Sequence, residues 1–189
     1  KISSNDIQLF LQGLSKNKIS ERTLARKLAS IKSLFNYLVR QEKISVNIAK
    51  LIKSPKIPKR LPNYLSVTEI SSLLDYPYGD TFKDYRDRLI LELFYATGLR
   101  ISELVKIKIS NIQFEGCTIK VLGKGNKERI VIIGNYAKKK LEDYLNCDNI
   151  KSSEYLFKKA RKSKNNYLSE RSVFNIVKKY TAKVTRNEQ

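Results

Sequence analysis

Three side chains of this sequence could together act on a phosphate group, and two of them lie in the stretch ATGLRISEL at residues 96–104. An apolar run over 89–96 predicts a helix that ends at Gly98, because glycine readily takes the left-handed conformation that closes a helix. A second helix is expected to begin near residue 101, which places Arg100 at the junction. Glu103 lies one helical turn further on and could hold the Arg100 guanidinium in place. The alternative is a buried structural Arg–Glu pair without a chemical role.

The third side chain is Lys124, which stands between two glycines in the segment GKGNK at residues 123–127. The flanking runs are typical of β-strands, so this segment is expected to be the turn of a hairpin. A hairpin can deliver a lysine ammonium into a groove, where it could protonate a departing alkoxide. The alternative is an ordinary solvated turn lysine. The segment is not a nucleotide-binding phosphate loop, because GxxxxGK[ST] is absent and the lysine joins two strands.

The charge of the chain favours a polyanionic partner. Lysine and arginine number 38 against 18 acidic residues, which gives a formal net charge of +20 over 189 residues. Such a charge repels itself unless a polyanion neutralises it, so nucleic acid is the first partner to consider and an anionic membrane surface the second. No apolar run in the sequence approaches the ~20 residues that a membrane span needs. We therefore expect no membrane-spanning segment, and we expect nucleic acid rather than a membrane as the partner.

Histidine and cysteine usage argues against a metal site. Histidine is absent, which removes the commonest metal ligand and the usual general base. Cys117 and Cys147 show neither a pairing pattern nor metal-ligand spacing, so we interpret them as reduced thiols. We expect a cytoplasmic protein that needs no metal and no cofactor.

Residues 1–58 are expected to form a basic helical block. A short first helix is predicted from a cap at Asn5 or Asp6 to Gly13, and a further helix over 46–52 closes the block. The clearest helix covers 21–40, with Ser20 as its cap. Its apolar residues follow 4-3-4-3 spacing and share one stripe: Leu24, Leu28, Ile31, Phe35 and Leu38.

The opposite stripe of the helix over 21–40 carries arginines with alanines near them. Small residues let a helix approach a phosphate backbone closely, and arginine binds phosphate through its planar fork. We therefore assign DNA contacts to four basic residues of this helix: Arg22, Arg26, Lys27 and Arg40. The alternative is an ordinary solvated basic face.

Three prolines at positions 55, 58 and 62 then predict a stiff, extended connector, because they cannot lie inside a helix. We place a basic proline-rich linker over 59–64, with Arg60 suited to a phosphate backbone. It separates a helical domain over 1–58 from a second domain over 65–189.

The second domain alternates helical and strand patterns. Capping residues at Ser66, Thr81 and Ser169 predict three helix starts, and helices also return from residue 136. Strands are predicted over 112–114, 118–122 and 129–133. The expected fold class is mainly α with a small antiparallel β-sheet.

The stretch at 96–104, followed about twenty residues later by VLGKGNKER at 121–129, resembles the tyrosine recombinases. Within them it is most similar to Xer-type recombinases and related phage integrases. The residues LP at 61–62, LS at 65–66 and YRDR at 85–88 match that family too. The basic helical block resembles the family's helical, SAM-like core-binding domain, and 65–189 its α+β catalytic domain. The resemblance covers essentially the whole chain.

The resemblance implies site-specific DNA recombination through a 3′-phosphotyrosyl intermediate. It implies that Arg100 binds the scissile phosphate, that Lys124 is the general acid for the leaving oxygen, and that Glu103 supports the site. Preorganised cationic donors would stabilise the charge of such a phosphoryl transfer without a metal. The implied partners are double-stranded DNA with an inverted-repeat core site and other subunits in a homo- or hetero-tetramer on that DNA. The residues expected to bind DNA are Arg22, Arg26, Lys27, Arg40, Arg60, Lys127, Arg129 and Arg171.

The family's His-x-x-Arg segment and nucleophilic tyrosine should follow a helix like 173–180, and the sequence given ends at Gln189 before them. By the family's pattern the chain is incomplete at both ends, so we expect it to bind DNA weakly and not to cleave it. One alternative is a truncated integrase-like DNA-binding module without catalytic activity. Another is a basic RNA-binding protein, which would leave the motifs of Arg100 and Lys124 unexplained. The sequence does not decide between three roles within the family: chromosome-dimer resolution in chromosome segregation, phage or plasmid integration, and cassette capture.

Overall fold

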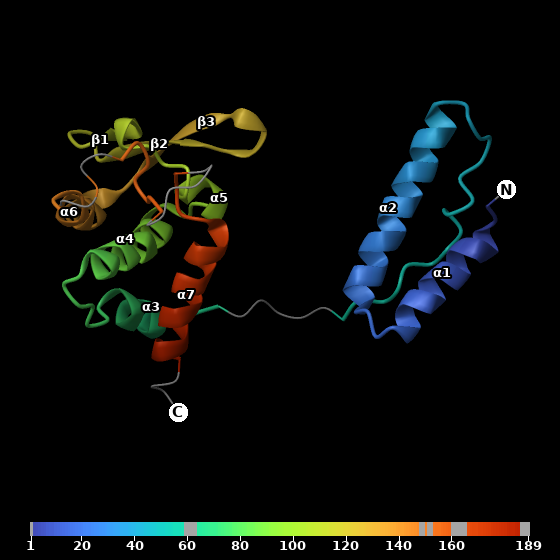
Figure 1. The fold of residues 1–189 in the computed structure, drawn as a ribbon, viewed down its shortest axis with the longest axis horizontal. Coiled ribbons are helices and arrows are strands. Elements are labelled where there is room, and N and C mark those ends of the chain that lie inside the picture. The colour runs from blue at the N-terminus through green and yellow to red at the C-terminus, as the bar shows by residue number, and fades with distance from the viewer. Residues whose placement is uncertain (1, 59–63, 148–149, 151–152, 160–165, 186–189) are drawn as a thin grey trace. The chain divides into compact units, whose positions relative to one another are not determined.

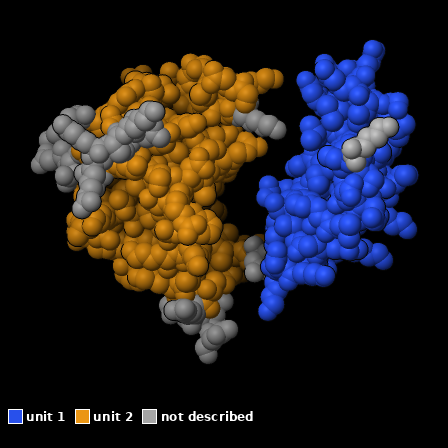
Figure 2. All heavy atoms as spheres, turned by 45° about the vertical axis from the view of Figure 1, so that its right-hand side comes forward, with its two compact units in different colours: residues 1–63 blue, residues 64–189 orange. Residues whose placement is uncertain are grey.

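The computed structural model describes residues 2–58, 64–147, 150, 153–159 and 166–185, with Lys124 described by its backbone alone. The chain divides into two compact units, residues 1–63 and 64–189 (Figure 2). Most of the predicted linker, Arg60 included, lies outside the described residues. In the part of the chain that is described, no helix is long and apolar enough to span a membrane.

The described residues of the N-terminal unit form two helices, α1 (Ser4–Lys16) and α2 (Glu21–Arg40) (Figure 1). The predicted cap of the first helix is wrong, because Ser3 rather than Asn5 or Asp6 occupies that position. The Asp6 carboxylate instead accepts from the Ser3 backbone N–H at 2.7 Å, while the Ser3 hydroxyl accepts from the Asp6 N–H at 3.3 Å. This reciprocal pair is a capping box, which starts the helix at Ser4. The helix also extends three residues beyond the predicted end at Gly13, to Lys16.

The second helix agrees with its prediction. The Ser20 hydroxyl accepts a hydrogen bond from the Thr23 N–H at 3.3 Å and so caps α2. Leu24 and Leu28 of the apolar stripe are buried. Leu28 joins the small core of this unit, whose buried members are Ile7, Leu28, Ala49 and Ile52.

The helix predicted over 46–52 is wrong, because this segment forms turns. The Asn47 amide donates to the backbone oxygen of Lys32 at 3.1 Å, and its side-chain oxygen accepts from the Ala49 N–H at 2.9 Å. The Lys32 ammonium in turn donates to the backbone oxygen of Ile52 at 2.7 Å. Side-chain bonds thus hold the backbone of this segment in a non-helical path against α2.

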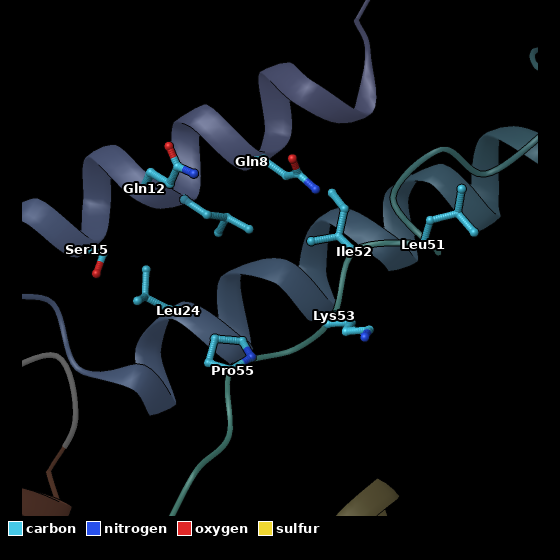
Figure 3. Close-up of a pocket in the computed structure, with 9 residues that line it drawn as sticks. Gln8, Gln12, Ser15, Leu24, Leu51, Ile52, Lys53 and Pro55 are labelled. Carbon is cyan, nitrogen blue, oxygen red and sulfur yellow. The ribbon is translucent and has the colours of Figure 1, made fainter.

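An open groove of about 500 Å³ lies in the N-terminal unit (Figure 3). Its lining comes from α1, from α2 and from the segment 51–55: Gln8, Leu11, Gln12, Ser15, Leu24, Leu51, Ile52, Lys53 and Pro55. Because this open groove lies between the two helices and that segment, they pack against each other over only part of their length. The core of the unit is correspondingly small.

The C-terminal unit combines helices with a three-stranded sheet, so the predicted fold class is confirmed (Figure 1). Its helices are α3 (Val67–Leu74), α4 (Phe82–Thr97), α5 (Ile101–Leu104), α6 (Gly134–Leu145) and α7 (Glu170–Val184). Its strands are β1 (Ile112–Gln113), β2 (Thr118–Leu122) and β3 (Glu128–Ile132), with short 3₁₀ turns η1 (Ile109–Asn111) and η2 (Lys124–Asn126). The strands are antiparallel in the order β1-β2-β3. The predicted helix starts at Ser66, Thr81 and Ser169 are confirmed by their side-chain caps.

The core of the C-terminal unit lies between the helices and one face of the sheet. Ile119 and Val121 of β2 are buried, and they stand opposite Val131 and Arg129 of β3. Residues directly opposite in an antiparallel pair share a face, so Arg129 projects from the inner face of the sheet. This placement governs the candidate site.

Candidate active site

Arg100 emerges from a glycine turn between two helices, as predicted. Gly98 closes α4 with φ 59° and ψ 28°, and its N–H donates to the Phe94 carbonyl at 3.0 Å. Leu99 is buried, and Arg100 then takes an extended conformation at the start of α5. The left-handed glycine turns the chain within two residues. The buried Leu99 anchors that turn directly before the arginine.

A buried carboxylate holds the exposed Arg100 guanidinium. Glu103 is 3% exposed, whereas the Arg100 side chain is 69% exposed. One carboxylate oxygen of Glu103 accepts from the Arg100 backbone N–H at 2.8 Å, and the other accepts from its Nη1 at 3.1 Å. A fully buried structural pair is therefore not what forms here, because the arginine faces solvent.

A second arginine, which lies on the sheet, binds the same carboxylate. Arg129 of β3 donates from Nη1 to Oε1 of Glu103 at 3.2 Å and from Nη2 to Oε2 at 3.0 Å. The Arg129 side chain is 39% exposed. The sequence predicts Arg129 only as a DNA-binding residue, and this pairing was not predicted. The strand alternation that puts Arg129 on the face of Val131 is the pattern that could have revealed it.

The surroundings of Glu103 favour its ionised form. Burial by itself would raise the pKa of this carboxyl group, but the hydrogen bonds from Arg100 and the charges of Arg129 and Arg100 oppose it. Together they leave the pKa of Glu103 below its usual value. The carboxylate therefore stays charged and keeps both guanidinium groups attached at neutral pH.

Because the pKa of Glu103 is lower in the folded protein, ionised Glu103 stabilises the fold above its unfolded-state pKa. This contribution is lost as the pH falls below the ordinary value of 4.5 toward the lower, folded-state value. We expect urea unfolding to show a stability gap between wild type and Glu103→Gln at pH 6 that shrinks on acidification. A gap of constant size from pH 6 to pH 3 would contradict this linkage.

The hairpin that carries Lys124 begins beside the same carboxylate. The Gly123 N–H donates to the Lys127 carbonyl at 2.7 Å and closes the β2–β3 turn. A Cβ placed on Gly123 would lie 3.5 Å from Oε1 of Glu103, so the strand end approaches this group closely. The backbone of Lys124 follows directly in η2, and its side chain lies outside the described residues. The elements that carry Arg100 and Lys124 therefore meet at Glu103.

The other residues predicted to bind DNA lie on both units. Arg22, Arg26 and Arg40 are exposed on α2, where Lys27 is half-buried. In the C-terminal unit Lys127 is exposed in the hairpin, and Arg171 is exposed in the first turn of α7. Their contacts with DNA stay predictions.

Comparisons with known proteins agree with the motifs. Residues 63–189 match the profile described as "Phage integrase family", and residues 1–42 match "Phage integrase, N-terminal SAM-like domain". The chain is 36% identical over 190 residues to the tyrosine recombinase XerC of Natranaerobius thermophilus, covering 95% of this chain and 62% of the relative. It is 50% identical over 121 residues to the XerC of Myxococcus xanthus, covering 64% of this chain and 40% of the relative.

A solved structure shows the same fold. The XerH site-specific recombinase bound to its difH substrate aligns with a TM-score of 0.73 at 21% identity, covering 98% of this chain and 54% of that one. The chain thus spans about half the length of the relatives it matches. The resemblance expected from the stretches at 96–104 and 121–129 is confirmed: the chain belongs to the phage integrase family and is similar to the Xer tyrosine recombinases.

Proposed function

We propose that this chain binds double-stranded DNA and holds the scissile phosphate in a tyrosine-type site-specific recombinase, which breaks and rejoins DNA through a 3′-phosphotyrosyl intermediate. The observation that carries this proposal is the exposed Arg100 guanidinium, fixed by a buried carboxylate beside the Lys124 hairpin. The net charge of +20 supports a polyanionic partner. The XerC relatives and the DNA-bound XerH structure support the reaction class.

The geometry suits phosphoryl transfer. Charge spreads over the non-bridging oxygens of the phosphorus in the transition state, and donors fixed in advance stabilise that charge. Glu103 takes one N–H of the Arg100 guanidinium, at Nη1, and the rest of this exposed group can face a phosphate. Lys124 would supply the proton that the 5′ leaving oxygen needs.

We assign no nucleophile among the eleven tyrosines of this chain. A nucleophilic tyrosine must reach the phosphorus and lose its proton. Tyr144 is fully buried, and burial raises its pKa and that of Tyr78 well above the usual range. These two side chains therefore serve packing rather than attack.

The proposed assembly follows the same reasoning. A lambda integrase tetramer bound to a Holliday junction shares the fold at 18% identity with a TM-score of 0.67. We propose that the intact protein likewise acts as a homo- or hetero-tetramer on an inverted-repeat core site. Cross-linking on such a duplex tests the number of subunits, and a protein that stays monomeric on saturated DNA would contradict this assembly.

Binding of a labelled inverted-repeat duplex tests the DNA part of the proposal. We expect Arg100→Ala to weaken binding and to reduce the slope of log affinity against log salt by about 0.9, the loss of one phosphate contact. Lys139→Ala, at an exposed lysine of α6, is the matched control and should leave the slope near the wild-type value. Equal competition by single-stranded RNA, or an unchanged slope in Arg100→Ala, would overturn the proposal.

The cleavage step is tested with the protein encoded by the full reading frame on a nicked suicide duplex. We expect a covalent protein–DNA complex, formed about 10²–10³-fold more slowly by Arg100→Ala, as for other single donors to a transition-state charge. If the wild-type protein binds the duplex but forms no covalent complex, it is a DNA-binding module without catalytic activity.

A further inference from the structure

Two arginines share the single carboxylate of Glu103, and they differ in how many of their guanidinium N–H groups that carboxylate takes up. Arg100 gives Glu103 its backbone N–H and one guanidinium N–H, whereas Arg129 gives N–H groups from both Nη atoms. Arg129 also has the less exposed side chain, at 39% against 69%. The forked, two-point contact is the form in which arginine binds a carboxylate most firmly.

We propose that Arg129 is a positioning residue, which acts on the scissile phosphate through Glu103 and Arg100 rather than by touching DNA itself. This inference rests on the proposed function. The sequence predicts that Arg129 contacts DNA directly, whereas we propose that Arg129 affects DNA binding indirectly, by fixing Glu103.

The hydrogen bonds explain how Arg129 fixes Glu103. An ionised carboxylate has about four lone-pair sites, and the four N–H donors of Arg100 and Arg129 fill them, two on each oxygen. Rotation of the Glu103 carboxylate would break bonds to both arginines. Without Arg129, each carboxylate oxygen would keep a single bond to Arg100, Oε1 to Nη1 and Oε2 to the backbone N–H, so half of the bonds that fix Glu103 would be lost.

The charges give Arg129 a second effect. Glu103 and Arg100 by themselves form a neutral pair, which attracts a phosphate weakly. With Arg129 added, the cluster of two guanidinium groups and one carboxylate carries a net positive charge. Arg129 therefore offsets the Glu103 charge and leaves that of Arg100 available to the phosphate.

The position of Arg129 in the sheet also ties the hairpin to α5. Arg129 stands opposite Val121 in the β2–β3 pair. Val121 lies two positions before Gly123 in the chain. Gly123 itself approaches Oε1 of Glu103 without a side chain in between. The ion pair between Arg129 and Glu103 thus holds the base of the turn that carries Lys124 against the helix that carries Arg100.

A double-mutant cycle with this chain separates positioning from direct contact. We measure the affinity of Arg100→Ala, Arg129→Ala and the double variant for an inverted-repeat duplex, together with their salt dependence. We expect each single variant to bind roughly tenfold more weakly and the double variant to lose much less than the roughly hundredfold product of the two losses, because the main effect of Arg129 passes through Arg100. The salt slope of the double variant should equal that of Arg100→Ala.

Direct contact predicts a different pattern. If Arg129 binds a phosphate itself, the two losses multiply and the salt slope of the double variant falls by about 0.9 beyond that of Arg100→Ala, which overturns the inference. Lys127→Ala is the matched control, since this exposed hairpin lysine is expected to add its loss independently to that of Arg100→Ala. An unchanged affinity in Arg129→Ala likewise overturns the inference.

Two further variants keep the test decisive. If Arg129→Ala does not fold, as judged by urea unfolding, Arg129→Lys replaces it, since lysine keeps the charge but loses the fork. Arg129→Lys should then recover part of the affinity in the presence of Arg100 and have a clearly smaller effect in its absence. A failure of Arg100→Ala to weaken binding would instead defeat the proposed function, whatever Arg129 does.

Discussion

Replacing Leu28 by alanine is expected to unfold the N-terminal unit while the C-terminal unit stays folded. Leu28 is fully buried in a core with only three other buried members in the described residues, Ile7, Ala49 and Ile52. Truncation of a buried leucine to alanine costs about 2–5 kcal/mol. A single core in a unit of this size rarely supplies more than about 3–5 kcal/mol, so we expect the loss to approach the whole free energy of unfolding.

Amide hydrogen exchange read by mass spectrometry on the full chain measures this effect unit by unit. Peptides from α1 and α2 should lose their protection in Leu28→Ala, and peptides from α4 should keep theirs. Leu34→Ala is the control, because this residue of the same helix is 55% exposed and its truncation should cost less than about 0.5 kcal/mol. Protection of α1 and α2 at the wild-type level in Leu28→Ala would contradict the prediction.

The features that sequence predicted well are those set by neighbouring residues. Ser20, Ser66, Thr81 and Ser169 cap helices through bonds to backbone N–H groups three residues on, so each start is readable locally. The Gly98 turn is equally local. The position of the first helix start was misjudged because two polar residues near it can both act in a capping box, one as cap and one as its reciprocal partner.

The segment 46–52 shows why other features could not be predicted. Its apolar residues suit a helix, but the bonds of Lys32 to Asn47 and to Ile52 join residues 15 and 20 positions apart and fix turns instead. Such contacts depend on where α2 has already placed its side chains. Tertiary context then overrides a weak local preference for helix.

The candidate site divides in the same way. The Arg100–Glu103 contact spans one helical turn and was predicted from spacing alone. The Arg129–Glu103 contact joins residues 26 positions apart and needs the register of β2 with β3, which the sequence does not state. The strands were predicted, but the sequence alone does not show that the inner face of the sheet, which carries Arg129, packs beside α5, which carries Glu103.

Asp87 gives the second large expected effect, in the C-terminal unit. Its carboxylate is 4% exposed and accepts from Nε and Nη2 of Arg86 at 2.9 and 2.6 Å. It also accepts from the Tyr180 hydroxyl at 3.4 Å, which links α4 to α7. The Arg86 side chain is only 18% exposed, so it has little access to water when its partner is removed.

We expect Asp87→Ala to lower the free energy of unfolding of the C-terminal unit by about 3–5 kcal/mol, because it leaves the Arg86 charge largely buried without its partner. Urea unfolding followed by exchange in α4 and α7 peptides measures the loss. Asp80→Ala, at an exposed aspartate before the same helix, should cost less than about 0.5 kcal/mol.

The double variant Arg86→Gln/Asp87→Asn separates the cost of the unpaired charge from that of lost packing. The new side chains, glutamine and asparagine, have nearly the size of the originals. Neither carries a charge, so no charge is left buried without a partner. If the charge left on Arg86 dominates, the double variant is more stable than Asp87→Ala and recovers at least half of the loss. If the double variant is no more stable than Asp87→Ala, the contribution of Asp87 lies in its packing, its bond to the Tyr180 hydroxyl and its ion pair with Lys179, whose Nζ lies 4.0 Å from Oδ2. Asp87 would then stabilise the unit through its contacts with α7 rather than by pairing with Arg86.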